Sequence, residues 1–455
     1  MMEQPRSAED RAASEKVDGV ELRASVDDVR DEPSSIALEH GVAEKSISAQ
    51  AREETTDPPS VQRPAYILPL IVVSQLAGTS LWFAGNAVLD DLIDDWGEDD
   101  NINISSSARG YLTSVVQLGF IAGTLMSALL NLPDRFPPTR LFMLCSLAGA
   151  LFNAIIPFWK SLGGLISLRL LTGICLAGIY PVGMKVASDW FQNGLGRALG
   201  WLVGALAVGS ALPFLLNRLP QPWEALLWET SILASIGGLA VGFLVPTGPY
   251  HKAGTRMDPS IVWTLFEDAE FRAASFGYFC HMWELYAFWV WCPTVWEQYL
   301  STPQGDSVSW DENSVTFAVL AVGGLGCVLG GLLSDWYGSA VVAFGALFTS
   351  GTLCLLSPAL FLAPPAVMLL AYLLWGLTVV ADSPQFSSLV ASTAPATSKG
   401  SALTIVNCIG FAITIGSIQL LDVPISEQFL FILLAPGPIL GLWNMIILLP
   451  SFNRK

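Results

Sequence analysis

Residues 169–190 read RLLTGICLAGIYPVGMKVASDW and place Arg169 in a run that is otherwise free of charge from Ser161 to Met184. Such a run is long enough to cross a bilayer core of about 30 Å. An arginine buried there is costly, so it should face protein or a watery cavity and meet an acid or backbone carbonyls. The stretch predicts a membrane helix whose charge serves a functional site or, alternatively, only clamps two helices together.

The rest of this stretch predicts how the helix packs and ends. Gly173, Ala177 and Gly178 leave one side nearly flat, which lets a neighbouring backbone come close. Pro181 removes one helical hydrogen bond and is expected to bend the helix. Lys185 and Asp189 are four residues apart and can pair at the water boundary.

The composition excludes an ordinary soluble protein. Of 455 residues, 52% are hydrophobic and 13% charged, against about 25% charged in soluble domains. Nearly half of the net charge of −17 comes from residues 1–60, which hold 15 acidic and 7 basic residues, and the rest is spread over loops, so it indicates no nucleic-acid partner. All seven cysteines lie in apolar segments, which argues against a disulfide framework and against a metal site.

The apolar runs predict an all-α polytopic membrane protein with twelve transmembrane helices in two six-helix bundles. Each run is near the roughly 20 residues that a spanning helix needs. The bundles are expected at 61–246 and 273–455, joined by a central cytoplasmic loop at 247–272. The runs are 65–88, 108–130, 140–159, 161–184, 197–217, 226–246, 273–300, 314–333, 340–362, 365–390, 401–421 and 428–449.

The placement of Lys and Arg predicts the orientation. If the N-terminus is cytoplasmic, most basic residues near the membrane lie inside, so both ends are expected in the cytoplasm. Residues 1–60 are rich in charge and poor in apolar residues, which predicts a disordered acidic cytoplasmic tail without a signal peptide. The acidic first outer loop contains the sequon Asn103-Ile-Ser105, a glycosylation candidate or equally a chance match.

The two halves of the chain contain matching residues at nearly constant offsets. Leu170-Leu171-x-Gly173 followed by Pro181 recurs as Leu373-Leu374-x-Gly376 followed by Pro384, an offset of 203. Gly123 and Asp134 recur as Gly324 and Asp335, an offset of 201. Two matches at nearly one offset indicate a duplicated unit, from which secondary transporters build a central site.

Four ionisable residues are predicted to lie deep in the membrane: Arg169, His281, Glu284 and Asp382. We assign them to substrate binding or proton coupling. Burial favours the neutral form of a carboxyl and a nearby guanidinium favours the ionised form, so an acid subject to both can exchange protons. Glu284 is expected to meet Arg169 across the centre, either for coupling or as a structural ion pair. A hydrogen-bonded core histidine and a helix-end gate remain the alternatives for His281 and Asp382.

Polar and aromatic residues on several spans are candidates to line a cavity. They are Gln75, Thr79, Trp82, Asn86, Gln117, Tyr180, Trp283, Tyr286 and Asn407. Each could equally bond to another helix or face lipid. No phosphate loop, His-Glu-x-x-His or Gly-x-Ser-x-Gly motif is present, so we expect neither an ATP-driven pump nor an enzyme, and no cofactor.

The sequence resembles the major facilitator superfamily across roughly residues 65–450. The segment 331–338, GLLSDWYG, resembles the cytoplasmic loop motif of that superfamily, and DRFPPTR at 134–140 is a first-half copy with proline where glycine is usual. Arg169-x-x-x-Gly173 resembles its fourth-helix motif. LAGIYPVGMK, GYFCHMWELYAFW and ADSPQFSSLV are most similar to a branch often grouped with nitrate, nitrite or cyanate porters.

This resemblance implies alternating access, with gating residues that latch the bundles at the cytoplasmic face. These residues are Asp134, Arg135, Arg140, Gly331 and Asp335. Related nitrate porters carry an arginine deep in the second and eighth helices and an Asn-Gly-rich fifth helix. This chain lacks all of these, so the resemblance does not imply nitrate as substrate.

We therefore predict a secondary active transporter of a small organic or anionic solute, with possible proton coupling. A passive facilitator and a non-transporting membrane receptor are the alternatives. The expected partners are the solute, protons and the lipid bilayer, without nucleic acid, and the chain is expected to be monomeric. The plasma membrane is expected rather than an organelle.

Overall fold

All regular elements in the described part of the chain are helices. The computed structural model describes residues 64–100, 108–191, 194–251, 261–306, 308–395 and 398–446. The predicted tail at 1–60, the sequon Asn103 and residues 252–260 of the central loop lie outside these ranges. The helices are α2 (Ile67–Thr79), α3 (Ala84–Ala87), α4 (Leu89–Asp100), α5 (Ala108–Leu129), α6 (Leu132–Arg135), α7 (Pro138–Ile155), η1 (Ile156–Phe158), α8 (Leu162–Leu176), α9 (Tyr180–Trp190), α10 (Leu195–Leu216), α11 (Trp223–Leu244), α12 (Ile261–Glu267), α13 (Ala269–Leu300), α14 (Glu312–Tyr337), α15 (Ser339–Leu360), α16 (Pro365–Ala381), α17 (Ser383–Thr393), α18 (Lys399–Leu420), η2 (Glu427–Leu434) and α19 (Pro436–Met445).

The chain is an all-helical, multi-pass membrane protein. Among the described residues, 10 helical segments are long and apolar enough to cross a membrane, and α2 is a shorter apolar helix of 13 residues. The predicted seventh span forms the 32-residue helix α13, which is not among the ten. Its His, Glu, Trp and Tyr side chains make it less apolar than the others. Twelve spans and two cytoplasmic ends therefore stay predictions.

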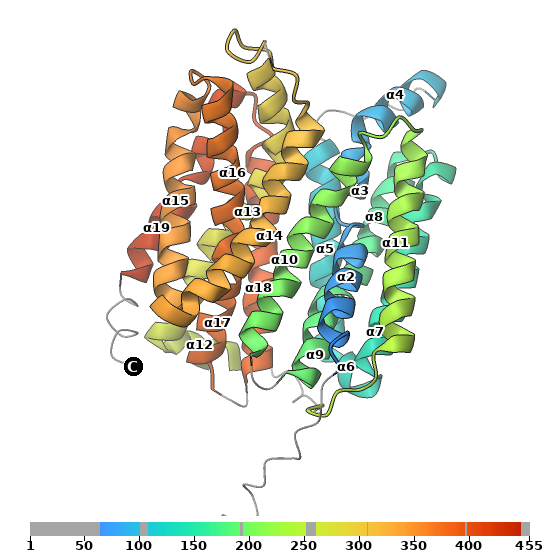
Figure 1. Ribbon diagram of the computed structural model, residues 1–455, viewed down its shortest axis with the longest axis vertical. Coiled ribbons are helices and arrows are strands. Elements are labelled where there is room, and N and C mark those ends of the chain that lie inside the picture. Colours follow the sequence, from blue (N-terminus) through green and yellow to red (C-terminus); the bar gives the residue numbers. More distant parts are fainter. Residues whose placement is uncertain are drawn as a thin grey trace, which may run out of the picture. The chain divides into compact units, whose positions relative to one another are not determined.

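Helices within each half of the chain pack mainly on one another. In the first half, α5 packs on α8, α7 on α11, and α2 on α10 and α11. In the second half, α14 packs on α16, and α13 on α17, α18 and α19. The halves meet most extensively where α10 packs on α14 and α5 on α18, with smaller contacts of α10 with α17 and of α5 with α13, and Figure 1 shows α10 and α14 side by side. The exact division at 246 and 273 stays a prediction.

Three helical runs are interrupted near their middle. The predicted fourth span stops at Leu176 and resumes at Tyr180, just before Pro181, so the predicted bend is present. Asp382 separates α16 from α17 in the same way, again just before a proline, Pro384. The first span breaks between Thr79 and Ala84. Such breaks expose backbone polar groups, which is tolerated only where protein or water satisfies them.

Glycines set the distance between helices at equivalent places in the two halves. A Cβ on Gly173 would lie 2.1 Å from the Val116 carbonyl oxygen, and one on Gly376 would lie 2.0 Å from that of Val319. Gly376 follows Gly173 by 203 residues, and Val319 follows Val116 by the same number, which is the offset of the predicted repeat. Helices α8 and α16 therefore touch the backbones of α5 and α14 directly.

We name the two ends of the helix array by residues. The Lys185 side is the end at which α2 begins and α9 stops, and the Asp311 side is the end at which α14 begins and α4 lies (Figure 1). The predicted orientation places the Lys185 side in the cytoplasm.

Candidate functional site

Arg169 is fully buried and is held by neutral oxygen atoms of the first half. It donates from Nη1 to the Leu81 carbonyl at 3.0 Å and to Asn153 Oδ1 at 3.3 Å, and from Nη2 to the Trp82 carbonyl. Leu81 and Trp82 lie in the break between α2 and α3, where the carbonyls are outside regular helix. The guanidinium thus replaces helical hydrogen bonds that the break removes.

Glu284 is the centre of a similar polar cluster in the second half. Its carboxylate accepts hydrogen bonds from Trp375 Nε1 at 2.6 Å, Ser350 Oγ at 2.9 Å and Cys354 Sγ at 3.4 Å. These donors lie on α15 and α16, and the Glu284 side chain is fully buried. Cys354 follows Asn153 by 201 residues, so the two clusters use a corresponding position on α7 and α15.

The predicted ion pair between Arg169 and Glu284 is wrong. In the described part of the chain no hydrogen bond or ion pair joins these two side chains, and each is hydrogen-bonded inside its own half. The alternative of a structural ion pair across the centre fails for the same reason. Arg169 does clamp helices together, but through backbone carbonyls and an amide within the first half.

His281 and Asp382 form a buried pair that the sequence did not predict as a pair. His281 Nδ1 lies 2.8 Å from Asp382 Oδ1, and each side chain is 1% exposed. The two atoms are close enough for an ion pair but are not aligned as a hydrogen bond. His281 Nε2 and Asp382 Oδ2 have no protein partner among the described residues. Asp382 stands in the break between α16 and α17, so the pair adjoins interrupted backbone.

Four aromatic rings fill the contact between the halves, towards the Asp311 side from the His281–Asp382 pair. We call Trp82, Phe120, Tyr286 and Phe411 the aromatic plug; the first two belong to the first half and the others to the second. Trp82 stacks on Tyr286 at 5.6 Å and on Phe411 at 5.8 Å, and Phe120 lies 4.5 Å from Phe411. All four are nearly fully buried. Trp82 and Tyr286, predicted to line a cavity, therefore fill the space between the halves.

Other predicted cavity residues bond to neighbouring helices. Asn86 donates to the Arg109 carbonyl at 3.0 Å and to Thr113 Oγ1 at 2.9 Å. Gln117 accepts a hydrogen bond from Thr414, which joins α5 to α18 across the halves. Asn407 accepts one from Tyr278 Oη at 2.6 Å. For these three residues, the structure therefore shows the alternative prediction, a hydrogen bond to another helix.

The remaining predicted cavity residues are packed in different ways. Thr79 donates to the Gln75 carbonyl of its own helix at 2.9 Å. The Gln75 amide is fully buried and has no hydrogen-bond partner among the described residues. Trp283 packs against α19, where a Cβ on Gly437 would lie 2.6 Å from its ring. Tyr180, at the first turn of α9, is half-buried.

A cavity of about 510 Å³ lies between the halves on the Lys185 side, and we call it the Lys185 cavity. None of the nine predicted cavity residues lines it. Sequence reasoning missed it because a cavity between helix ends depends on how far those ends separate. Its lining residues are Thr124, Ser127, Ala128, Asn131, Pro133, Ala177, Pro181, Val182, Met184, Lys185, Ser188, Leu199, Gly400, Ser401, Leu403 and Thr404.

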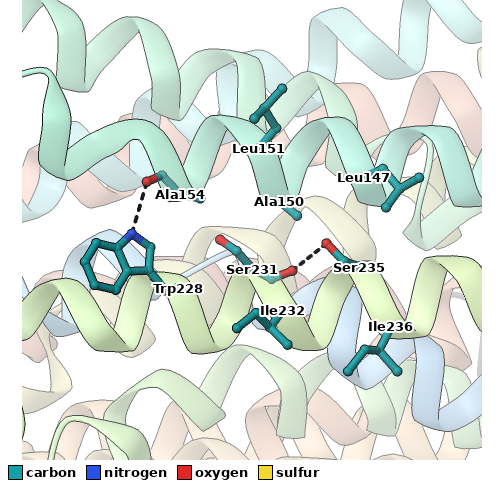
Figure 2. A pocket seen from close by; sticks show the side chains of 9 residues that line it. All are labelled: Leu147, Ala150, Leu151, Ala154, Trp228, Ser231, Ile232, Ser235 and Ile236. Carbon is teal, nitrogen blue, oxygen red and sulfur yellow. Dashed lines mark hydrogen bonds between the residues drawn. The ribbon is translucent and has the colours of Figure 1, made fainter.

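A second groove, of about 460 Å³, lies on the surface of the first half alone. It runs between α7 and α11 and is lined by aliphatic and small side chains, with Trp228 closing one end by donating to the Ala154 carbonyl at 3.3 Å (Figure 2). Ser231 and Ser235 donate to carbonyls of their own helix. Because the second half does not contribute to this groove, it is no candidate for a passage between the halves.

Ion pairs between the halves lie at both ends of the α10–α14 contact. Arg197 Nη2 lies 3.7 Å from Asp335 Oδ2 on the Lys185 side, and Arg218 Nε lies 3.1 Å from Asp311 Oδ2 on the Asp311 side. Between them, Gly204 and Gly324 meet closely, since a Cβ on either would lie 2.8 Å from the carbonyl oxygen of the other. Asp335, one of the predicted gating residues, thus lies opposite Arg197 of the other half, and its latching role stays a prediction.

The other predicted gating residues show no such contact in the part of the chain that is described. Arg135 and Arg140 are exposed, without an ion pair to any described side chain. A Cβ on Gly331 would meet nothing within 4 Å. The Asp134 side chain lies outside the described structure. A latching role for these four residues stays a prediction.

Protonation of Asp311 is expected to weaken the contact on the Asp311 side. Burial raises the pKa of this carboxyl, but hydrogen bonds from the Ser314 backbone N–H and hydroxyl, with Arg218 nearby, outweigh burial and hold the pKa below its ordinary value. Because folding lowers the pKa of Asp311, its carboxylate stabilises the fold at pH values above its ordinary pKa of about 4. This contribution is lost as the pH falls through the pKa of the folded protein.

Replacing Asp311 by alanine should therefore cost about 0.5–2 kcal/mol of unfolding free energy at pH 7, the usual loss for an N-cap. The difference from wild type should shrink below a pH of about 4. Asp311→Asn keeps a capping oxygen and loses only the ion pair, so it should cost less. Thermal melts in detergent across this pH range measure the effect, and a pH-independent difference would contradict it.

Comparisons with known proteins identify the family of residues 67–417 and relatives of about a third of the chain. A family model described as the Major Facilitator Superfamily matches residues 67–417. YgaY, an uncharacterized transporter of Escherichia coli strain K12, is 27% identical over 179 residues, which are 38% of this chain and 44% of that protein. A triacylglyceride transporter of Mycobacteroides abscessus is 31% identical over 161 residues, 34% of this chain and 30% of that protein. This chain thus matches less than half of either relative.

Solved structures of transporters have the same fold. The nucleoside transporter NupG superimposes with a TM-score of 0.63 at 12% identity, and the human organic anion transporter MFSD10 (TETRAN) with 0.64 at 14% identity. Each comparison covers 84% of this chain and 100% of the other. Identities this low show the fold alone.

Proposed function

Because the chain belongs to the Major Facilitator Superfamily, it is a membrane transporter and not an enzyme, and we propose that it moves a small organic or anionic solute by proton-coupled alternating access. The two halves would rock about the α10–α14 contact, so that a site between them faces each side of the membrane in turn. The narrower resemblance to nitrate, nitrite or cyanate porters stays a prediction.

The observation that carries the proposal is the pairing of the Lys185 cavity with the aromatic plug. The cavity is lined by both halves, through α5, α9 and α10 of the first and α18 of the second. Towards the Asp311 side, the four rings of the plug and the Arg218–Asp311 ion pair keep the halves together. A passage closed at one end and hollow at the other is what one state of an alternating-access carrier requires.

The His281–Asp382 pair is our candidate for proton coupling. A carrier of protons needs a buried acid or base with a lone pair that water can reach when the cavity opens. His281 Nε2 and Asp382 Oδ2 are free to exchange a proton if water reaches them, since neither has a protein partner in the described structure. Glu284 fits it less well, because three donors already occupy its carboxylate. Arg169 is bonded entirely within its own half.

Transport by purified protein in lipid vesicles tests the coupling. With a pH-sensitive dye inside, a transported solute from a screen of anions and amino acids should change the internal pH. His281→Gln and Asp382→Asn should each abolish this pH change while exchange of the solute itself continues. Glu284→Gln should keep both. A Glu284→Gln variant that exchanges solute without moving protons would instead assign coupling to Glu284.

A passive facilitator is the second candidate, and one observation favours it. Arg169 and Glu284, two of the deep charges, hold helices together inside their own halves. If the His281–Asp382 pair is likewise structural, no proton is coupled. The same vesicles separate the two functions, because a facilitator moves solute down its gradient with no change of internal pH in the wild type.

We place the protein in the plasma membrane as a monomer, with both ends and the Lys185 side in the cytoplasm. The bias of Lys and Arg toward the predicted inner loops supports this orientation. In this orientation the Lys185 cavity faces the cytoplasm, so the structure would correspond to an inward-facing state. Attachment of an impermeant label to a cysteine introduced at the exposed Arg197, in intact and in permeabilised cells, tests the orientation.

A further inference from the structure

Lys185 brings a positive charge to the wall of the Lys185 cavity. Within the described part of the chain, it is the charged residue among those that line this space. The neighbouring lining is mostly apolar, with Met184, Leu199 and Leu403, and hydroxyl groups such as Thr124 add hydrogen-bonding capacity. An ammonium group among apolar side chains attracts an anion more strongly than one in bulk water, although Asp189 offsets part of its charge.

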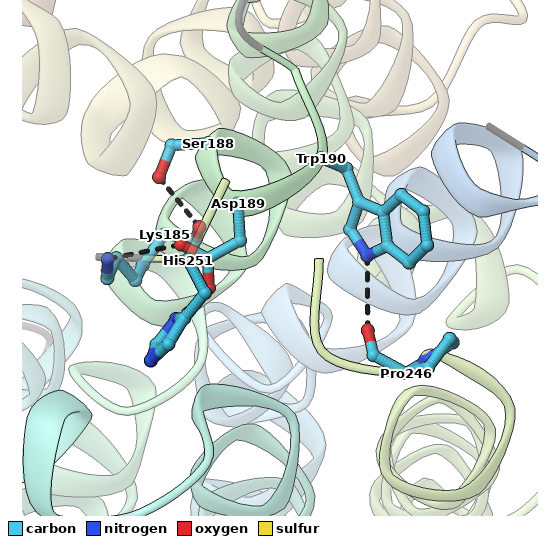
Figure 3. Close-up of polar contacts among 6 residues, drawn as sticks. All are labelled: Lys185, Ser188, Asp189, Trp190, Pro246 and His251. Atoms are coloured by element: carbon cyan, nitrogen blue, oxygen red, sulfur yellow. Dashed lines mark hydrogen bonds and ion pairs between the residues drawn. The ribbon is translucent and has the colours of Figure 1, made fainter. Parts of the chain in front are cut away.

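Asp189 fixes the position of this lysine. Its Oδ1 lies 3.1 Å from Lys185 Nζ, one helical turn away on α9, and the Asp189 side chain is only 5% exposed against 26% for Lys185. The other oxygen, Oδ2, lies 2.7 Å from His251 Nδ1 (Figure 3). The carboxylate therefore lies behind the lysine, away from the solvent, and the ammonium stands nearer the cavity.

The segment 246–251 holds this cluster in place. The Tyr250 backbone N–H donates to the Asp189 carbonyl at 3.0 Å, and Trp190 Nε1 donates to the Pro246 carbonyl at 3.1 Å (Figure 3). A Cβ on Gly248 would lie 2.1 Å from the Asp189 carbonyl oxygen, so the segment 246–251 touches the backbone of α9. His251 holds the Asp189 carboxylate and Tyr250 holds the Asp189 backbone carbonyl, so the counter-ion of the lysine is pre-organised, which reduces the entropy lost on binding.

From this arrangement we propose that Lys185 binds the carboxylate of a monoanionic organic solute in the Lys185 cavity, with the solute's apolar body against Met184, Leu199 and Leu403. This deepens the proposed function and depends on the cavity being the solute's passage. A cation would be repelled by Lys185. A dianion would bring a second charge next to Asp189 with no further lysine or arginine on the described lining.

Binding to the purified full-length protein in detergent tests the site without any transport. Benzoate and its neutral isostere benzamide are the probes, measured by calorimetry. Benzoate should bind saturably and benzamide at least about tenfold more weakly, since a charge-assisted contact is lost. Lys185→Gln should weaken benzoate binding by a similar factor, and Lys185→Arg should largely retain it. The matched control Lys160→Gln removes a lysine that is paired with Asp95 at 3.4 Å outside this cavity, and should not change binding.

Each outcome decides the proposal. Equal binding of benzoate and benzamide, no saturable binding of benzoate to a folded wild type, or unchanged binding by folded Lys185→Gln would overturn it. If Lys185→Gln does not fold, the preference for benzoate over benzamide in the wild type and its retention in Lys185→Arg still decide. Because calorimetry needs no proton gradient, benzoate binding without any flux in vesicles would refute the transport function and leave this site standing.

Discussion

Replacing Arg169 by methionine is expected to destabilise the protein by about 2–4 kcal/mol, because buried acceptors lose their donor at about 1–3 kcal/mol each while the cost of burying a charge disappears. The acceptors are the Leu81 and Trp82 carbonyls in the break after α2, and Asn153 Oδ1. The loss should appear as a lower melting temperature of the detergent-solubilised protein. The melting temperature of Arg169→Lys should lie between those of the wild type and Arg169→Met, since one ammonium cannot reach all three acceptors.

The matched control is Arg197→Met, which removes an arginine whose side chain is 68% exposed. Its effect on stability should be within about 0.5 kcal/mol, as for most surface changes. If Arg169→Met melted like this control but no longer transported solute, Arg169 would be a functional residue rather than a structural one. That result would restore the substrate or coupling role predicted from the sequence.

Alanine at Gly173 or at Gly376 is expected to cost about 1–3 kcal/mol or more, the usual range for overpacking. Each new Cβ would lie about 2 Å from a backbone carbonyl oxygen, of Val116 or of Val319, and a backbone cannot turn aside as a side chain can. The helix pairs α5–α8 and α14–α16 would have to move apart. Because the two contacts are equivalent, the two losses should be similar.

Gly345→Ala on α15 is the control for these variants, because its Cβ would meet nothing within 4 Å. It should be neutral or slightly stabilising, since alanine favours helix by up to about 1 kcal/mol over glycine. Melting temperatures of the three variants measure the comparison. A Gly173→Ala protein as stable as Gly345→Ala would mean that α8 does not touch the α5 backbone.

Features that depend on residues near one another along the chain were predictable. Hydrophobic runs of spanning length indicated a multi-pass helical protein, and the fold and the family confirm it. Pro181 indicated where the fourth span bends, and α9 begins one residue before it. The i,i+4 pair of Lys185 and Asp189 is also present, at 3.1 Å. Local sterics and hydrogen bonding decide each of these, so a short window of sequence contains enough information.

Partner choice among buried charges was not predictable. The sequence alone determined that Arg169 would be buried and would need acids or carbonyls, because hydrocarbon leaves no other option. Only the tertiary structure decided that carbonyls of the broken first span satisfy it, that Glu284 binds Trp375, and that His281 meets Asp382. Those partners are up to 101 residues apart, and the helix packing that brings them together depends on side-chain fit over many contacts rather than on spacing along the chain.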